Sequence, residues 1–231
     1  MQKILENQHV AIFQSSCKDG NLATHTGDAL QNVLRNRQKL TFLNHPIFWL
    51  NQTHSNRVTS TLDFSMDSDA IVSFEPNKVL AILTADCLPI LLYSQHAIAA
   101  IHAGWRGLAS GIVENTLNKI KACGLNQKHI ENLNVWLGPA IGECCFEVKD
   151  DVENAFSTQE QVFFKKSTLE QEKFCGNLKK IAIFKLEKAG ILSKNIQNFD
   201  VCTTCNADFF SHRRDKTIGR MASFILLQKG N

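Results

Sequence analysis

Short apolar runs bounded by polar residues recur along this chain and predict β-strands. Such runs, with Val, Ile, Leu and Phe frequent, are typical of strands buried on one or both faces. The expected strands span residues 9–14, 46–50, 70–74, 79–85, 89–94, 97–103, 133–139 and 217–228. Several follow one another with only a few residues between them, which predicts sheets with direct strand-to-strand connections.

Helical spacing appears in four further segments. The first spans residues 27–43, where the apolar residues near helical spacing are Leu30, Val33, Leu34 and Leu40. Asp28 is placed to stabilise the first turn of this helix through its charge. Helices over 107–124 and 177–190 are expected to stop at glycines, and a short one is expected over 151–156. Since strands occur both in succession and around helices, the chain predicts an α/β or α+β fold, one domain over residues 1–231 with mixed β-sheets flanked by helices.

Composition narrows the class of protein. With 231 residues, 44% hydrophobic and 20% charged, the chain is typical of a soluble globular protein with a sizeable core. A net charge of +3 is too small to indicate a nucleic-acid partner, and no apolar run approaches the roughly 20 residues of a membrane span. The first residues do not resemble a signal peptide. The eight cysteines are therefore expected to be mostly thiols in a reducing cytoplasm.

Polar side chains follow three of the predicted strands and suggest a shared site. The stretch "NQTHSNRV" (residues 51–58) brings Gln52 and His54 directly after an apolar run. Cys87 lies between two predicted strands, and His102 ends another. If neighbouring strands bring these ends together, two His and one Cys can bind a divalent metal, usually zinc with copper possible. Such a set leaves a fourth position open.

Two other interpretations of these residues stay open on sequence grounds. Cys87 can be the nucleophile of a hydrolase, with His102 as its base. Alternatively, a Cys and a His at strand ends can be ordinary structural residues. Asp86, beside Cys87, can transfer a proton or orient a ligand, or it can accept hydrogen bonds from nearby amides.

The remaining cysteines give weaker patterns. "CTTC" has the C-x-x-C spacing of Cys202 and Cys205, but the chain has no second C-x-x-C to complete a zinc site. We therefore expect a structural pair of thiols there, and local packing for Cys144 and Cys145. Cys17, Cys123 and Cys175 show no partner pattern and are expected to be small packed residues.

Five stretches together resemble the laccase-domain or YfiH family, whose members are named polyphenol oxidase, purine nucleoside phosphorylase and peptidoglycan editing factor. They are "QTHSNRV", "TADCLPILL", "IHAGWRGLASGIVENTL", "GPAIGECCFEV" and "CTTCNADFFSHRRDKTIGRMASFI". The resemblance runs from about Gly27 to the C-terminus, and five motifs in the family's order make it specific. It implies a compact single domain of mixed sheets and helices, related to cysteine-hydrolase-like domains.

The resemblance also implies an activity and a metal. The metal is usually zinc, with copper possible, and its implied ligands are His54, Cys87 and His102. The implied reactions are phosphorolysis of adenosine, inosine, guanosine and methylthioadenosine, with adenosine deamination alongside. Purine nucleosides and phosphate are then the partners of a monomer or homodimer that binds neither nucleic acid nor membranes. The alternatives are a copper-dependent polyphenol oxidase and a Cys/His hydrolase of amide or peptidoglycan-precursor substrates. Only two of the chain's eight histidines lie in the proposed site, too few for a multicopper cluster.

Residue roles follow from the same resemblance and from the chemistry of each group. Asp86, Cys87 and His102 are the expected catalytic residues. Gln52 is expected in the pocket, and Arg37 resembles the Asn-Arg pair on the family's first helix. Guanidinium groups suit phosphate binding, so the substrate-binding candidates are Arg37, Arg106 and Arg213, with Arg214 as the alternative to Arg213.

Overall fold

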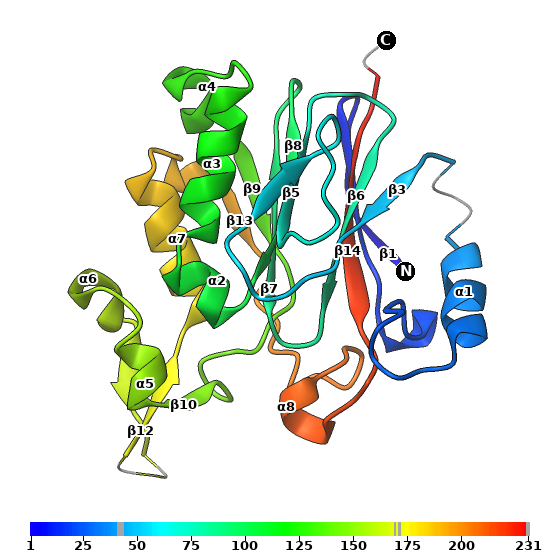
Figure 1. Cartoon of the computed structure of the whole chain (residues 1–231). Helices are drawn as coiled ribbons and strands as arrows, with labels where there is room; N and C mark the ends of the chain where they lie inside the picture. Colours follow the sequence, from blue (N-terminus) through cyan, green and yellow to red (C-terminus); the bar gives the residue numbers. More distant parts are fainter. Residues whose placement is uncertain (41–43, 169, 171, 230–231) are drawn as a thin grey trace.

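A computed structural model describes residues 1–40, 44–168, 170 and 172–229 (Figure 1). Its five-stranded sheet has the order β1 (Gln2–Glu6), β2 (Val10–Gln14), β14 (Met221–Leu227), β6 (Val79–Thr84) and β3 (Ile47–Trp49). Its six-stranded sheet has the order β13 (Ile196–Asn198), β9 (Asn134–Leu137), β7 (Leu88–Tyr93), β8 (Ile98–Ala103), β5 (Ala70–Ser73) and β4 (Val58–Ser60). A small sheet joins β10 (Glu147–Lys149), β12 (Lys173–Gly176) and β11 (Phe164–Lys166).

Helices lie outside the two large sheets (Figure 1). They are α1 (Leu30–Gln38), α2 (Trp105–Ala109), α3 (Ile112–Ala122), α4 (Gln127–Glu131), α5 (Asp150–Glu153), α6 (Thr158–Gln161), α7 (Leu178–Lys188) and α8 (His212–Asp215). Short 3-10 turns occupy Cys17–Asp19 and Ser193–Asn195. Within the described residues, no helix is long and apolar enough to cross a membrane.

The core forms where the two large sheets face each other. Side chains alternate along each strand, so Leu80 and Ile82 of β6 point between the sheets, where they pack with Leu91 of β7. The next residues along β7, such as Ile90, point outward and pack beneath α3 and α7 (Figure 1). Burial of each such side chain contributes roughly 1.5–3 kcal/mol. The outer face of the five-stranded sheet is covered by residues near the N-terminus, including Leu22.

The mixed α/β fold confirms the predicted fold class, with local differences. The expected helix over 107–124 is two helices, α2 and α3, because Gly111 adopts a left-handed φ of 90° between them. The expected helix over 27–43 is α1, and residues 41–43 lie outside the described part. In α1 only Val33 is buried, while Leu30 and Leu34 are exposed.

The expected strand over residues 46–50 is β3, which lies at the edge of its sheet and is only half-buried. The connection from β6 to β7 matters most for the site. It passes from the five-stranded to the six-stranded sheet through residues 85–87, and so carries Asp86 and Cys87 to the junction of the two sheets.

Candidate metal centre and its cavity

His102 owes its position to the alternation of side chains in β8. Ile98 and Ala100 point between the sheets, and the same period of two points His102 that way near the end of the strand. Its side chain is almost fully buried, and its Nδ1 lies 2.7 Å from Oδ1 of Asp69. A carboxylate at Nδ1 accepts the proton there and leaves Nε2 as the ring atom that can bind a metal.

The same Asp69 also shapes the loop that carries His54. Its carboxylate accepts the backbone N–H groups of Thr53, His54 and Ser55 at 3.2, 3.0 and 2.7 Å, and the Ser55 hydroxyl at 2.6 Å. His54 adopts a left-handed φ of 60°, which is costly for a residue with a side chain. The fully buried carboxylate of Asp69 therefore stabilises both the strained loop and the ring of His102.

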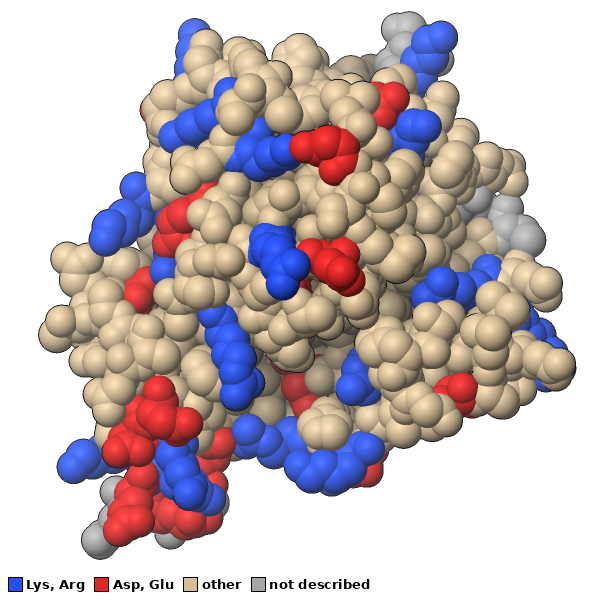
Figure 2. Space-filling view, in the orientation of Figure 1, with Lys and Arg blue, Asp and Glu red and all other residues tan. Residues whose placement is uncertain are grey.

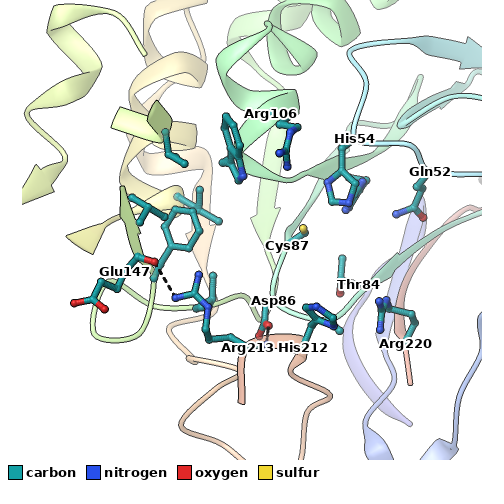
Figure 3. A pocket seen from close by; sticks show the side chains of 18 of the residues that line it. Gln52, His54, Thr84, Asp86, Cys87, Arg106, Glu147, His212, Arg213 and Arg220 are labelled. Atoms are coloured by element: carbon teal, nitrogen blue, oxygen red, sulfur yellow. Dashed lines mark hydrogen bonds between the residues drawn. The ribbon is translucent and has the colours of Figure 1, made fainter. Parts of the chain in front are cut away.

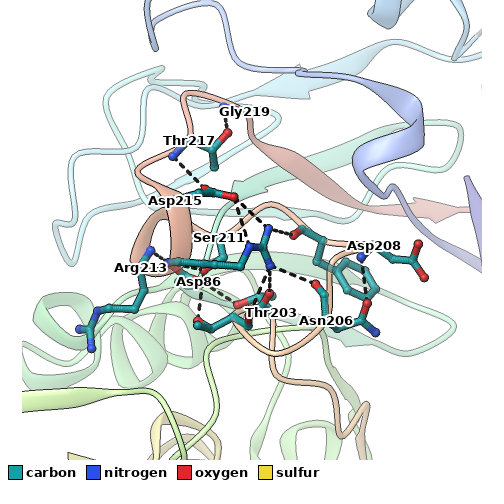
Figure 4. Close-up of polar contacts among 12 residues, drawn as sticks. Asp86, Thr203, Asn206, Asp208, Ser211, Arg213, Asp215, Thr217 and Gly219 are labelled. Carbon is teal, nitrogen blue, oxygen red and sulfur yellow. Dashed lines mark hydrogen bonds and ion pairs between the residues drawn. The ribbon is translucent and has the colours of Figure 1, made fainter.

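Cys87 is held by the turn that joins the two sheets. Asp86, just before it, has a φ of 89°, another strained conformation. Oδ1 of Asp86 accepts the Thr203 hydroxyl at 2.6 Å, and Oδ2 accepts the backbone N–H of Arg213 at 2.7 Å (Figure 4). These bonds tie the turn to the C-terminal loop, which supports a positioning role for Asp86; its predicted role in proton transfer stays a prediction.

The three candidate ligands converge. One ligand atom from each of His54, Cys87 and His102 lies within 4.8 Å of the others. Gly104 lies against them, and a Cβ there would approach Nδ1 of His54 to 2.8 Å and Sγ of Cys87 to 3.1 Å. Two imidazoles and one thiolate from three directions fit a tetrahedral zinc or copper ion with one open position.

Charges within the group favour an ionised thiol. Burial opposes ionisation of Cys87, but the charges and hydrogen bonds of His102 and His54 outweigh it and lower the pKa of the thiol to about 6. Burial also disfavours the His102 cation, yet Cys87 and Asp69 raise the pKa of His102 to about 9. The pKa of Asp69 falls to about 2 because hydrogen bonds from His102 and Ser55 overcome its burial. A thiolate is the form of cysteine that binds metals.

The group opens into a cavity of about 620 Å³ (Figure 3). Apolar side chains, including Trp105, Ile141 and Phe146, form part of its wall. Arg106, Arg213 and Arg220 also line it. Figure 2 shows Lys and Arg side chains around the hollow on this face and acidic atoms within it. The apolar wall and the three arginines suit a ligand with an apolar part and an anionic part.

Several cavity residues have no counterpart among the sequence predictions. His25, Thr84, His212 and Arg220 line the cavity. The Thr84 hydroxyl is buried and has no hydrogen-bond partner among the residues that the structure describes. Arg220 approaches from the start of β14, and only its position after a glycine in "TIGRM" could have drawn attention to it. Asp69 was also missed; the signal was a carboxylate directly before a buried strand, which needs partners.

The predicted substrate-binding residues divide into two groups. Arg106, Arg213 and Gln52 line the cavity, and the Gln52 amide exchanges two hydrogen bonds with the backbone of Leu83, at 2.7 and 2.8 Å. Arg37 is not among the described residues that line the cavity. Its Nε donates to the Leu22 carbonyl at 2.9 Å, and its guanidinium lies 3.8 Å from the ring centre of Trp49.

Fold and site together define a mixed α/β protein with a candidate two-histidine, one-cysteine metal site at the junction of two sheets. Residues 4–228 match the family described as multi-copper polyphenol oxidoreductase laccase. The chain belongs to this family, which also includes the YfiH proteins.

Individual relatives are similar over nearly the whole chain. Purine nucleoside phosphorylase YfiH of Escherichia coli is 38% identical over 217 residues, covering 90% of this chain and 86% of that protein. A purine nucleoside phosphorylase of Haemophilus influenzae is 38% identical over 218 residues, covering 89% and 85%. Among solved structures, Neisseria meningitidis protein NMB0706 has a TM-score of 0.87 at 33% identity and covers 99% of both chains. Bacillus licheniformis hypothetical protein YfiH has a TM-score of 0.84 at 28% identity, covering 98% of this chain and 99% of that one.

Proposed function

We propose that this chain is a metal-dependent purine nucleoside phosphorylase that also deaminates adenosine more slowly. The observation that carries the proposal is one cavity lined by both the His54, Cys87 and His102 group and three arginines. The names of the Escherichia coli and Haemophilus influenzae relatives support the same reaction. The proposed substrates are adenosine, inosine, guanosine and methylthioadenosine, with phosphate.

The reaction sets demands that the cavity residues meet. A phosphate oxygen forms a bond to ribose C1′ as the bond from C1′ to the purine nitrogen breaks, and the base leaves with a proton. Arg106, Arg213 and Arg220 can neutralise the phosphate, because guanidinium forks pair with its oxygens. The half-buried ring of Trp105 offers flat apolar surface to the purine.

The proposed metal is zinc, with copper possible, held by Nε2 of His102, a ring nitrogen of His54 and the Cys87 thiolate. When bound, such an ion acts as a Lewis acid that stabilises developing negative charge. Asp69 keeps the proton of His102 on Nδ1 and holds the His54 loop in its left-handed conformation. These contacts preorganise the ligands before the ion binds.

Two alternatives have specific support. The family description favours a copper-dependent polyphenol oxidase. Within the described part of the chain, however, the two possible metal groups contain only two histidines, His54 and His102. Two imidazole ligands are too few for several copper ions. The low pKa of Cys87, about 6, favours a Cys/His hydrolase of amide or peptidoglycan-precursor substrates.

Turnover with defined metal content tests the proposal. Zinc-loaded and copper-loaded protein should each be incubated with one purine nucleoside, with and without phosphate, and the products separated by chromatography. We expect free base and ribose 1-phosphate only when phosphate is present, and slower inosine formation from adenosine regardless of phosphate. Absence of phosphate-dependent base release from every purine nucleoside by metal-loaded protein would refute the phosphorylase proposal. Phenol oxidation by the copper form, or a covalent adduct on Cys87 that survives chelation, would favour the respective alternative.

A further inference from the structure

Four cysteines from two segments that lie far apart in the sequence meet in one group. The Sγ atoms of Cys144, Cys145, Cys202 and Cys205 all lie within 4.8 Å of one another. The distance from Cys205 to Cys144 is 3.7 Å, and from Cys205 to Cys145 it is 3.4 Å. The described lining of the cavity includes none of the four, so this group is separate from the site above.

Backbone hydrogen bonds bring the two segments together. One turn is closed by N–H groups of Cys145 and Phe146, which donate to the Gly142 carbonyl at 3.0 and 2.9 Å. The other is closed by Asn206, whose N–H donates to the Cys202 carbonyl at 3.0 Å. A parallel bridge between Ala140 and Cys202 aligns the two turns. The thiols therefore converge because the backbone places them, and each turn contributes two.

We propose that these four cysteines bind one zinc ion, or a similar thiol-binding divalent ion, in a closed structural site. Sulfur-only tetrahedral sites are typical of structural zinc, with Zn–S bonds of about 2.3 Å. Tetrahedral geometry then separates the sulfur atoms by about 3.8 Å. The observed 3.7 and 3.4 Å lie close to that value and far from the roughly 2.05 Å of a disulfide bond.

The surroundings suit a closed anionic site. Zinc binding would release the four thiol protons to solvent and leave a group with two negative charges. The Gly142 N–H donates to Sγ of Cys202 at 3.2 Å, a contact that stabilises a thiolate. A Cβ at Gly142 would lie 3.2 Å from Sγ of Cys144 and 3.3 Å from Sγ of Cys202, so the glycine leaves the space that the sulfur atoms occupy.

Two arginines hold the loops that carry the thiols. The Arg213 guanidinium donates to the carbonyls of Cys145 and Glu147 at 2.7 and 3.0 Å. The Arg214 guanidinium donates to the carbonyls of Thr203 and Asn206 in the second turn, at 2.9 and 3.3 Å. These contacts fix the backbone of both loops, and so the positions from which the thiols project.

The site also has a structural consequence for the cavity. Thr203 lies between Cys202 and Cys205, and its hydroxyl holds the carboxylate of Asp86. The proposed zinc would thus fix the turn that positions Cys87, without contacting the substrate. Its loss should lower stability first, and activity only through displacement of the cavity wall.

Metal analysis of three variants tests the proposal. The wild-type protein, purified with a reductant and with zinc supplied, should contain two zinc ions per chain. His54→Ala should retain one, and its zinc X-ray absorption spectrum should show sulfur neighbours alone at about 2.3 Å. The double variant Cys202→Ser/Cys205→Ser should also retain one zinc, with mixed nitrogen and sulfur neighbours, and should unfold at a lower temperature. The matched control Cys123→Ser/Cys175→Ser, which changes two thiols outside both groups, should keep both ions.

Two results would overturn the proposal. One is a His54→Ala protein without zinc whose four cysteines react as free thiols. The other is the same variant with an intact mass four units lower, because that loss of hydrogen means two disulfide bonds. Both measurements use His54→Ala, so the decision does not depend on whether the double cysteine variant folds.

Discussion

The two groups of potential metal ligands in this chain differ in where the backbone presents them. His54, Cys87 and His102 come from a loop, a turn and a strand at the junction of two sheets, and they border a cavity. The four clustered cysteines come from two loop turns and lie outside the described cavity lining. Three ligands leave a metal one open position for chemistry, whereas four close it. The comparison predicts that damage to the first group affects activity and damage to the second affects stability.

Cys87→Ala should give the largest effect on activity. Loss of one of three ligands should empty the first site, and loss of a Lewis acid worth several kcal/mol should lower phosphorolysis by roughly 1,000-fold or more. Metal content, turnover and the unfolding temperature should be measured together. Cys123→Ala, an exposed cysteine outside both groups, is the control. A full metal complement in both sites of Cys87→Ala would contradict the assignment of this ligand.

Asp86→Asn should separate catalysis from positioning. If Asp86 transfers a proton, deamination should fall by at least about 100-fold, and phosphorolysis should fall less because phosphate is already a nucleophile. If Asp86 only holds the turn through Thr203 and Arg213, both reactions should fall by the same factor. Thr203→Val removes the hydroxyl that holds Asp86 and keeps the carboxylate, so it shows the effect of lost positioning alone.

Arg220→Gln should raise the phosphate concentration needed for half-maximal phosphorolysis by about 10- to 100-fold. A charge-assisted hydrogen bond contributes roughly 1.5–3 kcal/mol, and deamination, which uses no phosphate, should change less. Arg37→Gln is the matched comparison, since Arg37 contacts Leu22 and Trp49 instead of the cavity. If Arg37→Gln raises the phosphate requirement while Arg220→Gln does not, the sequence-based role of Arg37 is the correct one.

A pair of glycine substitutions should give the smallest and most selective effects. An added Cβ at Gly104 would lie 2.8 Å from Nδ1 of His54, so Gly104→Ala should displace that ring and weaken metal binding by roughly tenfold. An added Cβ at Gly142 would lie 3.1 Å from Cβ of Cys202, so Gly142→Ala should disturb the cysteine group instead. Chelator competition measures the first effect, and thermal unfolding measures the second. Equal effects of both variants on turnover and on stability would contradict the division of roles.

Much of the fold follows from local pattern, and part of the site does not. Apolar runs predict most of the strands of the two large sheets, and Gly124 and Gly190 end their helices with left-handed φ values of 101° and 102°. The strands β1, β4 and β13 and the division between α2 and α3 were not predicted. One glycine within a helical run does not reveal whether the helix bends or stops. Similarly, the exposure of Leu34 in α1 depends on what packs against the helix, which periodicity does not show.

The candidate ligands were predictable by residue type, but the residues that hold them in position were not. Asp69 lies 15 residues after His54 and 33 before His102, and nothing near it in the sequence indicates that one carboxylate serves both. Cys145 and Cys205 are 60 residues apart, and the expectation of local packing for Cys144 and Cys145 did not include their contacts with Cys205. In each case the arrangement of the loops around the sheets determines which side chains meet.

By itself, the sequence determined the local structure and the kinds of ligand available. Strand and helix periods act over a few residues, glycines stop helices within one turn, and the residue types of His54, Cys87 and His102 already define a metal-binding chemistry. The tertiary structure decided which groups meet. It passed the chain from one sheet to the other at Cys87, brought Arg220 rather than Arg37 to the cavity, and joined two cysteine pairs into one group. The physical reason is that strand order and sheet packing depend on burial of the whole core, which no short segment specifies.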